Sequence, residues 1–176
     1  TSLGLACALA LVGVALSGGA EMHLTCGESD QPFAPTGLAF GAAMIGWAAA
    51  SLGDAETVDN MLDNLSTAYY YPTFASSHNA TKKGPDIFNA DISGGLPALM
   101  IEMLVQSRPG ELTLLSALPA RLKSGTLKGA LCRGRVTIEE LAWSPERVTV
   151  RLRSPKEQEL TLRVKSGDGW KTKTVR

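Results

Sequence analysis

The feature that most constrains the fold of this 176-residue chain is a change in hydrophobic periodicity near Arg108. Before that residue, apolar positions recur at the i, i+3, i+4 and i+7 spacing that places them on one face of a helix. After it, short segments alternate between apolar and polar residues and are separated by Gly, Pro or Ser-Pro turns. We therefore predict an α+β fold, with helices in residues 1–107 and a small antiparallel β-domain in residues 108–176.

The clearest helical pattern lies in AETVDNMLDNLSTAYYY, where the apolar face consists of Val58, Met61, Leu62 and Leu65. A Gly-Asp turn joins this helix to an apolar helix over residues 38–50, which predicts a helical hairpin. A further helix is expected over residues 97–106, with Pro97 in its first turn, where the missing N–H costs nothing.

Residues 3–16 are apolar nearly all round, as in a helix that is covered on every side. The same stretch is also compatible with the remnant of a signal sequence, and it is shorter than the roughly twenty residues of a membrane span. A bundle of so few helices cannot cover surfaces that are this apolar, so the helices need neighbours. The chain also has no starting Met. We therefore expect it to be the C-terminal portion of a longer polypeptide.

Six segments after Arg108 are predicted strands: 112–118, 126–134, 136–143, 147–154, 159–166 and 170–175. In RVTVRLRS the apolar residues alternate with Thr149 and Arg151, which predicts an antiparallel sheet with one wet face. These charged strands show no aromatic groove suited to a ligand. We therefore expect the β-domain to pack against the helical part and stabilise it.

Composition excludes several classes of function. Lys plus Arg and Asp plus Glu number 17 each, so neither a nucleic acid nor a membrane is an expected partner. The three cysteines are widely spaced, and no HExxH, GxSxG, phosphate-loop or dinucleotide motif is present. The sequence thus predicts no metal and no cofactor.

Polar residues near DIFNADISGGLPALMIEM are the candidates for a site. Asp91 precedes an apolar helix, where the helix N-terminus favours an ionised carboxylate that is suited to act as a general base. Alternatively, Asp91 is only the helix cap. Glu102 is either a substrate contact or a residue on the wet side of its helix, and His78 is a candidate for a polar ligand contact from its loop. The aromatic residues of 69–74, with Trp47, form either a sugar platform or part of the core.

Two longer segments, FNADISGGLPALMIEMLVQS and LTLLSALPARLKSGTLKGALCRGRVTIEELAW, resemble the end of glycoside hydrolase family 95, the α-L-fucosidases and related α-L-galactosidases. In that family an F-Q-I-D-G-N-F-G segment leads into a helix ending E-M-L-L-Q-S, followed by L-L-P-A-L-P, W-x-x-G-x-x-x-G-L-x-A-R-G-G and a strand with Trp. The similarity covers about residues 86–143. The matching positions include Phe88, Asp91, Gly95, Glu102, Gln106, Ser107, Pro119, Gly125, Gly129, Arg133, Gly134 and Trp143.

The resemblance implies that residues 1–107 are the last helices of an (α/α)₆ catalytic barrel and that residues 108–176 are the C-terminal β-domain. It also implies inverting exo-hydrolysis of terminal α-L-fucosyl or α-L-galactosyl residues, with Asp91 helping to activate the water. The general acid of the family lies on an earlier barrel helix, so this chain alone is expected to be incomplete and inactive. Its partners would be a carbohydrate substrate and the N-terminal remainder of the polypeptide.

The chain departs from the family pattern beside Asp91, where Ile92 and Ser93 replace Gly and Asn. Ser93 is therefore a candidate substrate contact that bears on the identity of the sugar. A competing hypothesis is a carbohydrate-binding or structural relative that has kept the scaffold without the chemistry. The class of substrate predicts a periplasmic or extracellular location.

Overall fold

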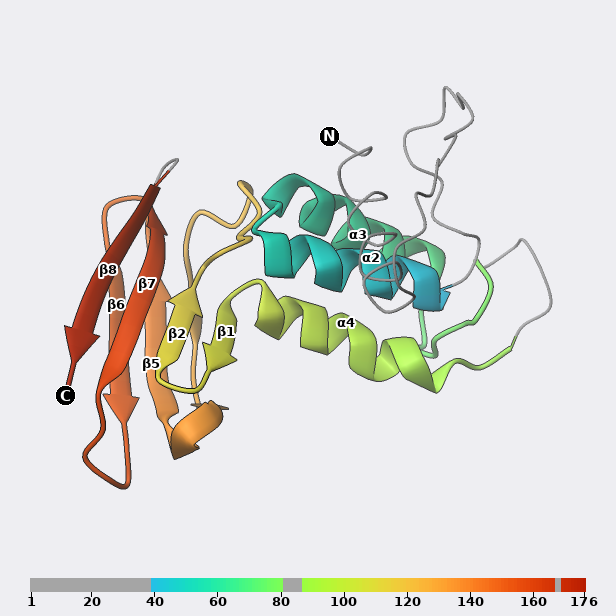
Figure 1. Ribbon diagram of the computed structural model, residues 1–176. Coiled ribbons are helices and arrows are strands. Elements are labelled where there is room, and N and C mark those ends of the chain that lie inside the picture. Colours follow the sequence, from blue (N-terminus) through green and yellow to red (C-terminus); the bar gives the residue numbers. More distant parts are fainter. Residues whose placement is uncertain (1–38, 81–86, 167–168) are drawn as a thin grey trace, which may run out of the picture.

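The computed structural model describes residues 39–80, 87–166 and 169–176, and shows helices at one end and strands at the other (Figure 1). The α+β class is confirmed for this part of the chain. The helix expected at 3–16 lies outside the described residues. The helices are α2 (Ala39–Leu52), α3 (Ala55–Ala68) and α4 (Ala90–Glu102).

Helices α2 and α3 form the predicted hairpin. The Asp54 side chain caps α3 by accepting a hydrogen bond of 3.0 Å from the backbone N–H of Thr57. Such a cap satisfies one of the backbone donors that the first helical turn leaves without a partner. The four apolar positions expected on one face of α3, Val58, Met61, Leu62 and Leu65, are all buried.

Helix α4 begins at Ala90, so the prediction of a start near Pro97 is wrong. Gly94 and Gly95 look like a turn in the sequence but lie inside the helix. Gly95 is buried and faces Ala43 of α2, which shows that close packing decides the local structure here. The helix also ends at Glu102 rather than at 106, because the chain becomes extended at Val105.

The first sheet has the strand order β1-β2-β7-β8. Strand β1 (Val105–Arg108), which the sequence analysis missed, pairs antiparallel with β2 (Glu111–Leu114). Strand β7 (Leu160–Ser166) pairs antiparallel with β8 (Gly169–Val175) but parallel with β2. The expectation of purely antiparallel pairing is therefore wrong at β2 and β7. After β2 the chain leaves this sheet to form the strands of a second sheet. It then re-enters the first sheet at β7, which runs in the same direction as β2.

That second sheet is built around β5 (Thr137–Trp143). Short strands β3 (Gly125–Leu127) and β4 (Ala130–Leu131) pair with β5, and so does β6 (Val148–Arg153), all antiparallel. Leucines of both sheets, together with Ile138 of the second, belong to one buried core. On β6, Leu152 is half-buried whereas its neighbours Arg151 and Arg153 are exposed, as the alternation predicts.

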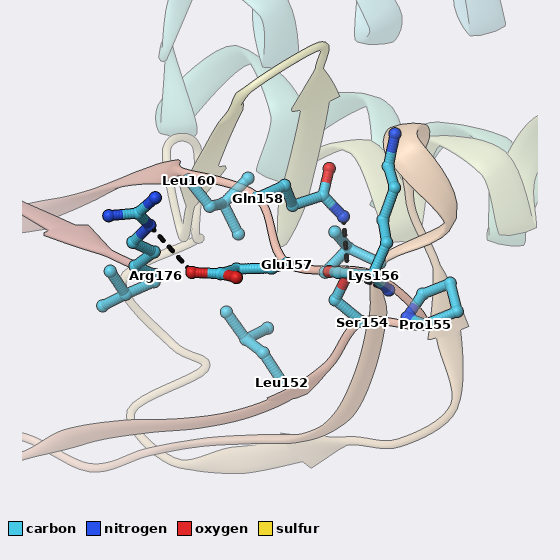
Figure 2. A pocket seen from close by; sticks show the side chains of 10 residues that line it. Leu152, Ser154, Pro155, Lys156, Glu157, Gln158, Leu160 and Arg176 are labelled. Carbon is cyan, nitrogen blue, oxygen red and sulfur yellow. Dashed lines mark hydrogen bonds and ion pairs between the residues drawn. The ribbon is translucent and has the colours of Figure 1, made fainter.

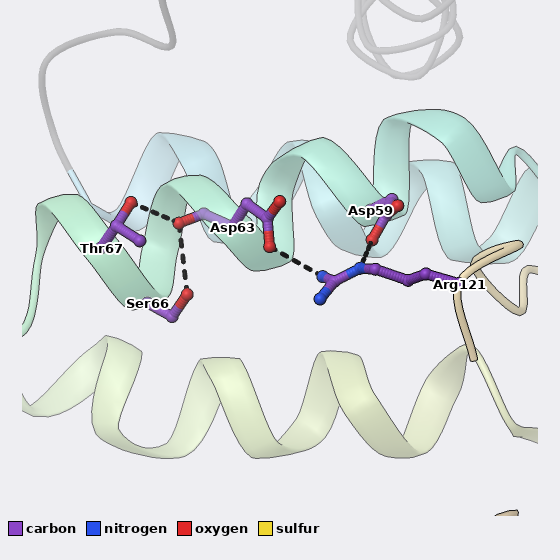
Figure 3. A network of polar contacts seen from close by, with 5 residues as sticks. All are labelled: Asp59, Asp63, Ser66, Thr67 and Arg121. Carbon is purple, nitrogen blue, oxygen red and sulfur yellow. Dashed lines mark hydrogen bonds and ion pairs between the residues drawn. The ribbon is translucent and has the colours of Figure 1, made fainter.

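Polar side chains of the β-strand part reach the helices. Gln106 donates hydrogen bonds to the Ala50 carbonyl (2.6 Å) and to Ser116 Oγ (2.9 Å). The Arg121 guanidinium contacts the carboxylates of Asp59 and Asp63 on α3 (Figure 3). These contacts join the sheets to the α2–α3 hairpin.

The packing of α4 makes a prediction about two helical glycines. Gly94→Ala should stabilise the protein by about 0.5–1 kcal/mol, because Ala is the better helix former and a Cβ at position 94 meets nothing within 4 Å. Gly46→Ala in α2 should destabilise it, because its Cβ would lie 2.6 Å from Cδ2 of the fully buried Leu99.

Chemical denaturation of both variants measures these two effects. Destabilisation by Gly94→Ala would contradict the helical start at Ala90. A gain from Gly46→Ala equal to that from Gly94→Ala would contradict the close contact between α2 and α4.

Candidate functional site

The candidate site is the N-terminal end of α4, where the buried side chain of Asn89 serves as the cap. Asn89 Oδ1 accepts a hydrogen bond of 3.0 Å from the backbone N–H of Ile92. Asn and Asp are both preferred at this position. The interpretation of Asp91 as the cap is therefore wrong.

Asp91 lies in the first turn of α4, and its side chain is exposed. It makes no hydrogen bond or ion pair with the rest of the described chain. Because Asn89 provides the cap, the carboxylate of Asp91 is available to a ligand or to water.

His78 is held close to this end of α4 by both its backbone and its ring. Its backbone N–H donates to the Ile87 carbonyl (2.7 Å), and its carbonyl accepts from the Ala39 N–H (3.0 Å). Its Nδ1 lies 3.0 Å from Nδ2 of Asn89. Since Oδ1 of Asn89 is engaged by Ile92, the amide nitrogen faces the ring and donates to it. Nδ1 is thus an acceptor, and Nε2 carries the proton of the neutral ring.

Ser93 belongs to the same hydrogen-bond network as Asn89 and His78, and Asp91 does not. Its hydroxyl lies 2.8 Å from Ser76 Oγ and 3.4 Å from the Asn89 carbonyl. Two residues along a helix correspond to about 200° of rotation, so Ser93 and Asp91 lie on opposite sides of α4. The structure therefore brings His78 and Ser93 together through Asn89, and leaves Asp91 on another face.

Glu102 lies on the same side of α4 as Asp91, but eleven residues further along. That separation is about 16 Å of helix rise. Glu102 is half-buried, and its burial raises the pKa of the carboxyl above the usual value, while the positive charge of Arg108 offsets part of this rise. Within the described part of the chain, no hydrogen bond or ion pair joins Glu102 to the other candidate residues.

The aromatic residues before α4 divide between core and surface. Tyr69 is buried, and the Tyr70 hydroxyl donates a hydrogen bond of 2.7 Å to the Ile92 carbonyl. Tyr70 and Tyr71 line a pocket of about 630 Å³ together with Ser93 and the exposed Phe74. The core role is therefore confirmed for Tyr69, whereas the role of the pocket-lining aromatic residues as a sugar platform stays a prediction.

Residues 106–175 match the family model described as glycoside hydrolase family 95, C-terminal domain. This segment contains all eight strands except the first residue of β1, and it includes the motif residues Gly125, Gly129 and Trp143. It is a family 95 C-terminal domain. The resemblance is confirmed here, and the chain contains a C-terminal portion of a family 95 protein.

The family 95 match begins after α4, so it does not include Asp91, Ser93 or Glu102. No curated protein matches the chain. Among the described residues, no group of three or more His, Cys, Asp or Glu side chains is arranged to hold a metal ion. None of the described helices has the length and apolar character needed to cross a membrane.

Sequence reasoning missed Asn89, which links the helix cap to His78. The signal was present, because Asn directly before a helix is a common cap. It was overlooked because the helix was expected to begin at Pro97, eight residues later.

Asn89→Ala should destabilise the protein by about 0.5–2 kcal/mol, because it removes both the cap and the partner of His78. Asn89→Asp keeps a capping oxygen and should cost less. Chemical denaturation of both variants compares these costs. Equal losses would show that the contact with His78, rather than the cap, is the stabilising interaction.

Burial of Glu102 predicts a pH dependence. Because the folded-state pKa of Glu102 is raised, protonation of this carboxyl favours the folded protein. This contribution to stability is complete below the unfolded-state pKa of about 4.3 and is lost as the pH rises through the folded-state pKa. Glu102→Gln should therefore raise the melting temperature relative to wild type at pH 7, with the difference shrinking toward pH 4. Melting curves at both pH values test this, and a constant difference would contradict it.

Proposed function

We propose that this chain is part of an exo-acting, inverting glycoside hydrolase that removes terminal α-L-fucosyl or α-L-galactosyl residues from oligosaccharides or polysaccharides. The observation that carries the proposal is the exposed Asp91 carboxylate at the N-terminal end of α4, shortly before a family 95 C-terminal domain. Family membership supports glycosidase chemistry in general. The fucosyl or galactosyl specificity comes from the resemblance of residues 86–143.

Inverting hydrolysis needs two groups on opposite faces of the sugar, about 6.5–9.5 Å apart, with room for a water between them. In the proposed mechanism Asp91 accepts the proton of that water as it attacks the anomeric carbon. The general acid protonates the leaving oxygen from the other face. Asp91 suits the role of the base, because it is exposed and lies at a helix N-terminus.

In this proposal α2 to α4 are the last helices of an (α/α)₆ barrel. The chain then divides into the barrel helices, residues 1–107, and the C-terminal β-domain, residues 108–176. The apolar side chains that these helices expose support it, since a larger barrel would cover them. They are Phe40 and Met44 on α2, and Met100 and Ile101 on α4. The general acid would then belong to earlier helices of the family fold, and the chain alone would be inactive.

We assign substrate contacts to His78, Ser93 and Glu102. The support is strongest for His78, since the contact with Asn89 Nδ2 directs its protonated Nε2 away from the cap. Glu102 would be reached only by a part of the substrate distant from Asp91. A carbohydrate substrate also agrees with a periplasmic or extracellular location.

One observation favours a non-catalytic carbohydrate-binding or structural relative. Ser93 stands where the family has Asn, and its hydroxyl is turned to Ser76 on the side of α4 away from Asp91. A relative of this kind would bind sugar without turnover and would tolerate Asp91→Asn.

The test is release of L-fucose or L-galactose from aryl glycosides and fucosylated oligosaccharides by the full-length protein. Asp91→Asn should lower kcat by about 10²–10⁴-fold, the range for loss of a general base. The matched control is Glu56→Gln, which changes an exposed carboxylate in the first turn of α3 and should leave the rate unchanged.

Circular dichroism of each variant verifies the fold. Equal rates for wild type and Asp91→Asn would remove Asp91 from the mechanism. Sugar binding without turnover in the wild-type protein would support the non-catalytic alternative.

A further inference from the structure

A pocket of about 650 Å³ lies where the loop from β2 to β3 meets the β5–β6 turn and strands β7 and β8. Its apolar lining comes from the loop and from β7, and includes Leu115, Leu118, Leu122 and Val164. This lining is contained in the family 95 domain and is separate from the end of α4. The inference below therefore does not depend on Asp91.

Positive charge is concentrated around this pocket. Its lining includes four basic side chains, Lys123, Arg147, Lys165 and Lys171, against the single carboxylate of Glu146. Lys165 Nζ donates to the Gly53 carbonyl, and Glu146 accepts a hydrogen bond from Ser144. The other three basic side chains have no ion pair with any described residue. In a chain with a formal net charge of zero, such a group favours an anionic ligand.

A second pocket of the same domain provides a contrast. It has a volume of about 460 Å³ and is formed by the β6–β7 loop and the chain end after β8 (Figure 2). Two of its three charged side chains bind one another, since Arg176 contacts Glu157 at 3.0 Å, whereas Lys156 has no ion pair with a described residue. Gln158 donates to Ser154 and to the Gly134 carbonyl. The Figure 2 pocket thus has one basic side chain without an ion pair, Lys156, whereas the basic pocket has three.

Trp143 gives the basic pocket an aromatic wall. Its indole N–H donates a hydrogen bond of 3.0 Å to the Leu122 carbonyl, which holds the ring in place. The ring lies directly over Gly125, where any Cβ would come within 2.3 Å of it. Trp143 remains half-buried at the pocket. The strand sequences alone did not predict an aromatic pocket, because its wall and its basic rim come from segments far apart in the chain.

We propose that this basic pocket binds an acidic saccharide, with the sugar ring against Trp143 and its carboxylate or sulfate ester at Lys123, Arg147 and Lys171. Amphipathic sugar rings pack on aromatic side chains through their C–H faces, while anionic groups bind lysine and arginine through charge-assisted hydrogen bonds. A saccharide is favoured over other anions because the pocket combines the aromatic wall and apolar lining with the charges, and because it belongs to a domain of a carbohydrate-active family.

Isothermal titration calorimetry of the full chain at low salt tests the proposal with defined probes. The acidic probes are a galacturonic acid trisaccharide and L-fucose carrying a sulfate ester, which distinguish the two sources of negative charge. The neutral probe is a galactose trisaccharide of the same linkage, and inorganic sulfate is the anion without a sugar. We expect at least one acidic saccharide to bind more tightly than the neutral trisaccharide and than sulfate.

The double variant Lys123→Gln with Lys171→Gln should weaken that binding about tenfold or more, the effect of losing one or two charge-assisted hydrogen bonds. The matched control is Arg135→Gln with Lys156→Gln, which removes the same charge from exposed positions outside this pocket. Binding should persist in the control.

Three results would overturn the inference. The first is no binding of either acidic saccharide. The second is equal weakening in the two double variants, which would indicate attraction to net charge alone. The third is binding of inorganic sulfate as tight as that of the saccharides, which would leave a simple anion site.

Discussion

The turn at Gly53 between α2 and α3 is the point on which the arrangement of helices and sheets depends. Gly53 has φ of 76°, a left-handed conformation that suits glycine at the end of a helix. The Ala50 carbonyl accepts hydrogen bonds from the Gly53 N–H and from Gln106, and the Gly53 carbonyl accepts from Lys165. The carbonyls at a helix C-terminus need partners and carry partial negative charge. Here residues of the family 95 domain provide these partners, which links that domain to the helical hairpin.

The position of the candidate site follows from this junction. Helix α4 packs on α2 where Gly46 meets Leu99, and it leads within three residues into β1. Its C-terminal end is therefore fixed by the sheet and its middle by the hairpin. At its N-terminal end, Asn89 provides the capping oxygen and Asp91 stays exposed. The group that stabilises the helix is therefore the amide of Asn89, and the carboxylate of Asp91 is not used for capping.

Charge in the β-domain is organised by the register of the strands. Arg151 lies directly opposite Glu140 in the pairing of β5 with β6, and it also contacts Glu139, which in turn binds Arg153. These pairs are exposed, so each contributes little to stability, but together they neutralise the face of the sheet. No such partners face Lys123, Arg147 and Lys171 within the described chain. Three basic side chains without an ion pair thus gather at one pocket.

The sequence by itself determined the α+β class, the α2–α3 hairpin, most strands and the family of residues 106–175, because periodicity and motif spacing are local properties of the chain. It also singled out Asp91 as a candidate base, which stays a prediction. Only the tertiary structure decided that α4 continues through Gly94, Gly95 and Pro97, since packing on α2 outweighs the local tendency of these residues to form a turn. The β1 strand and the parallel pairing of β2 with β7 also depend on the three-dimensional fold. Each is made by hydrogen bonds to a partner strand, and for β7 that partner lies some fifty residues away, beyond the reach of any local pattern.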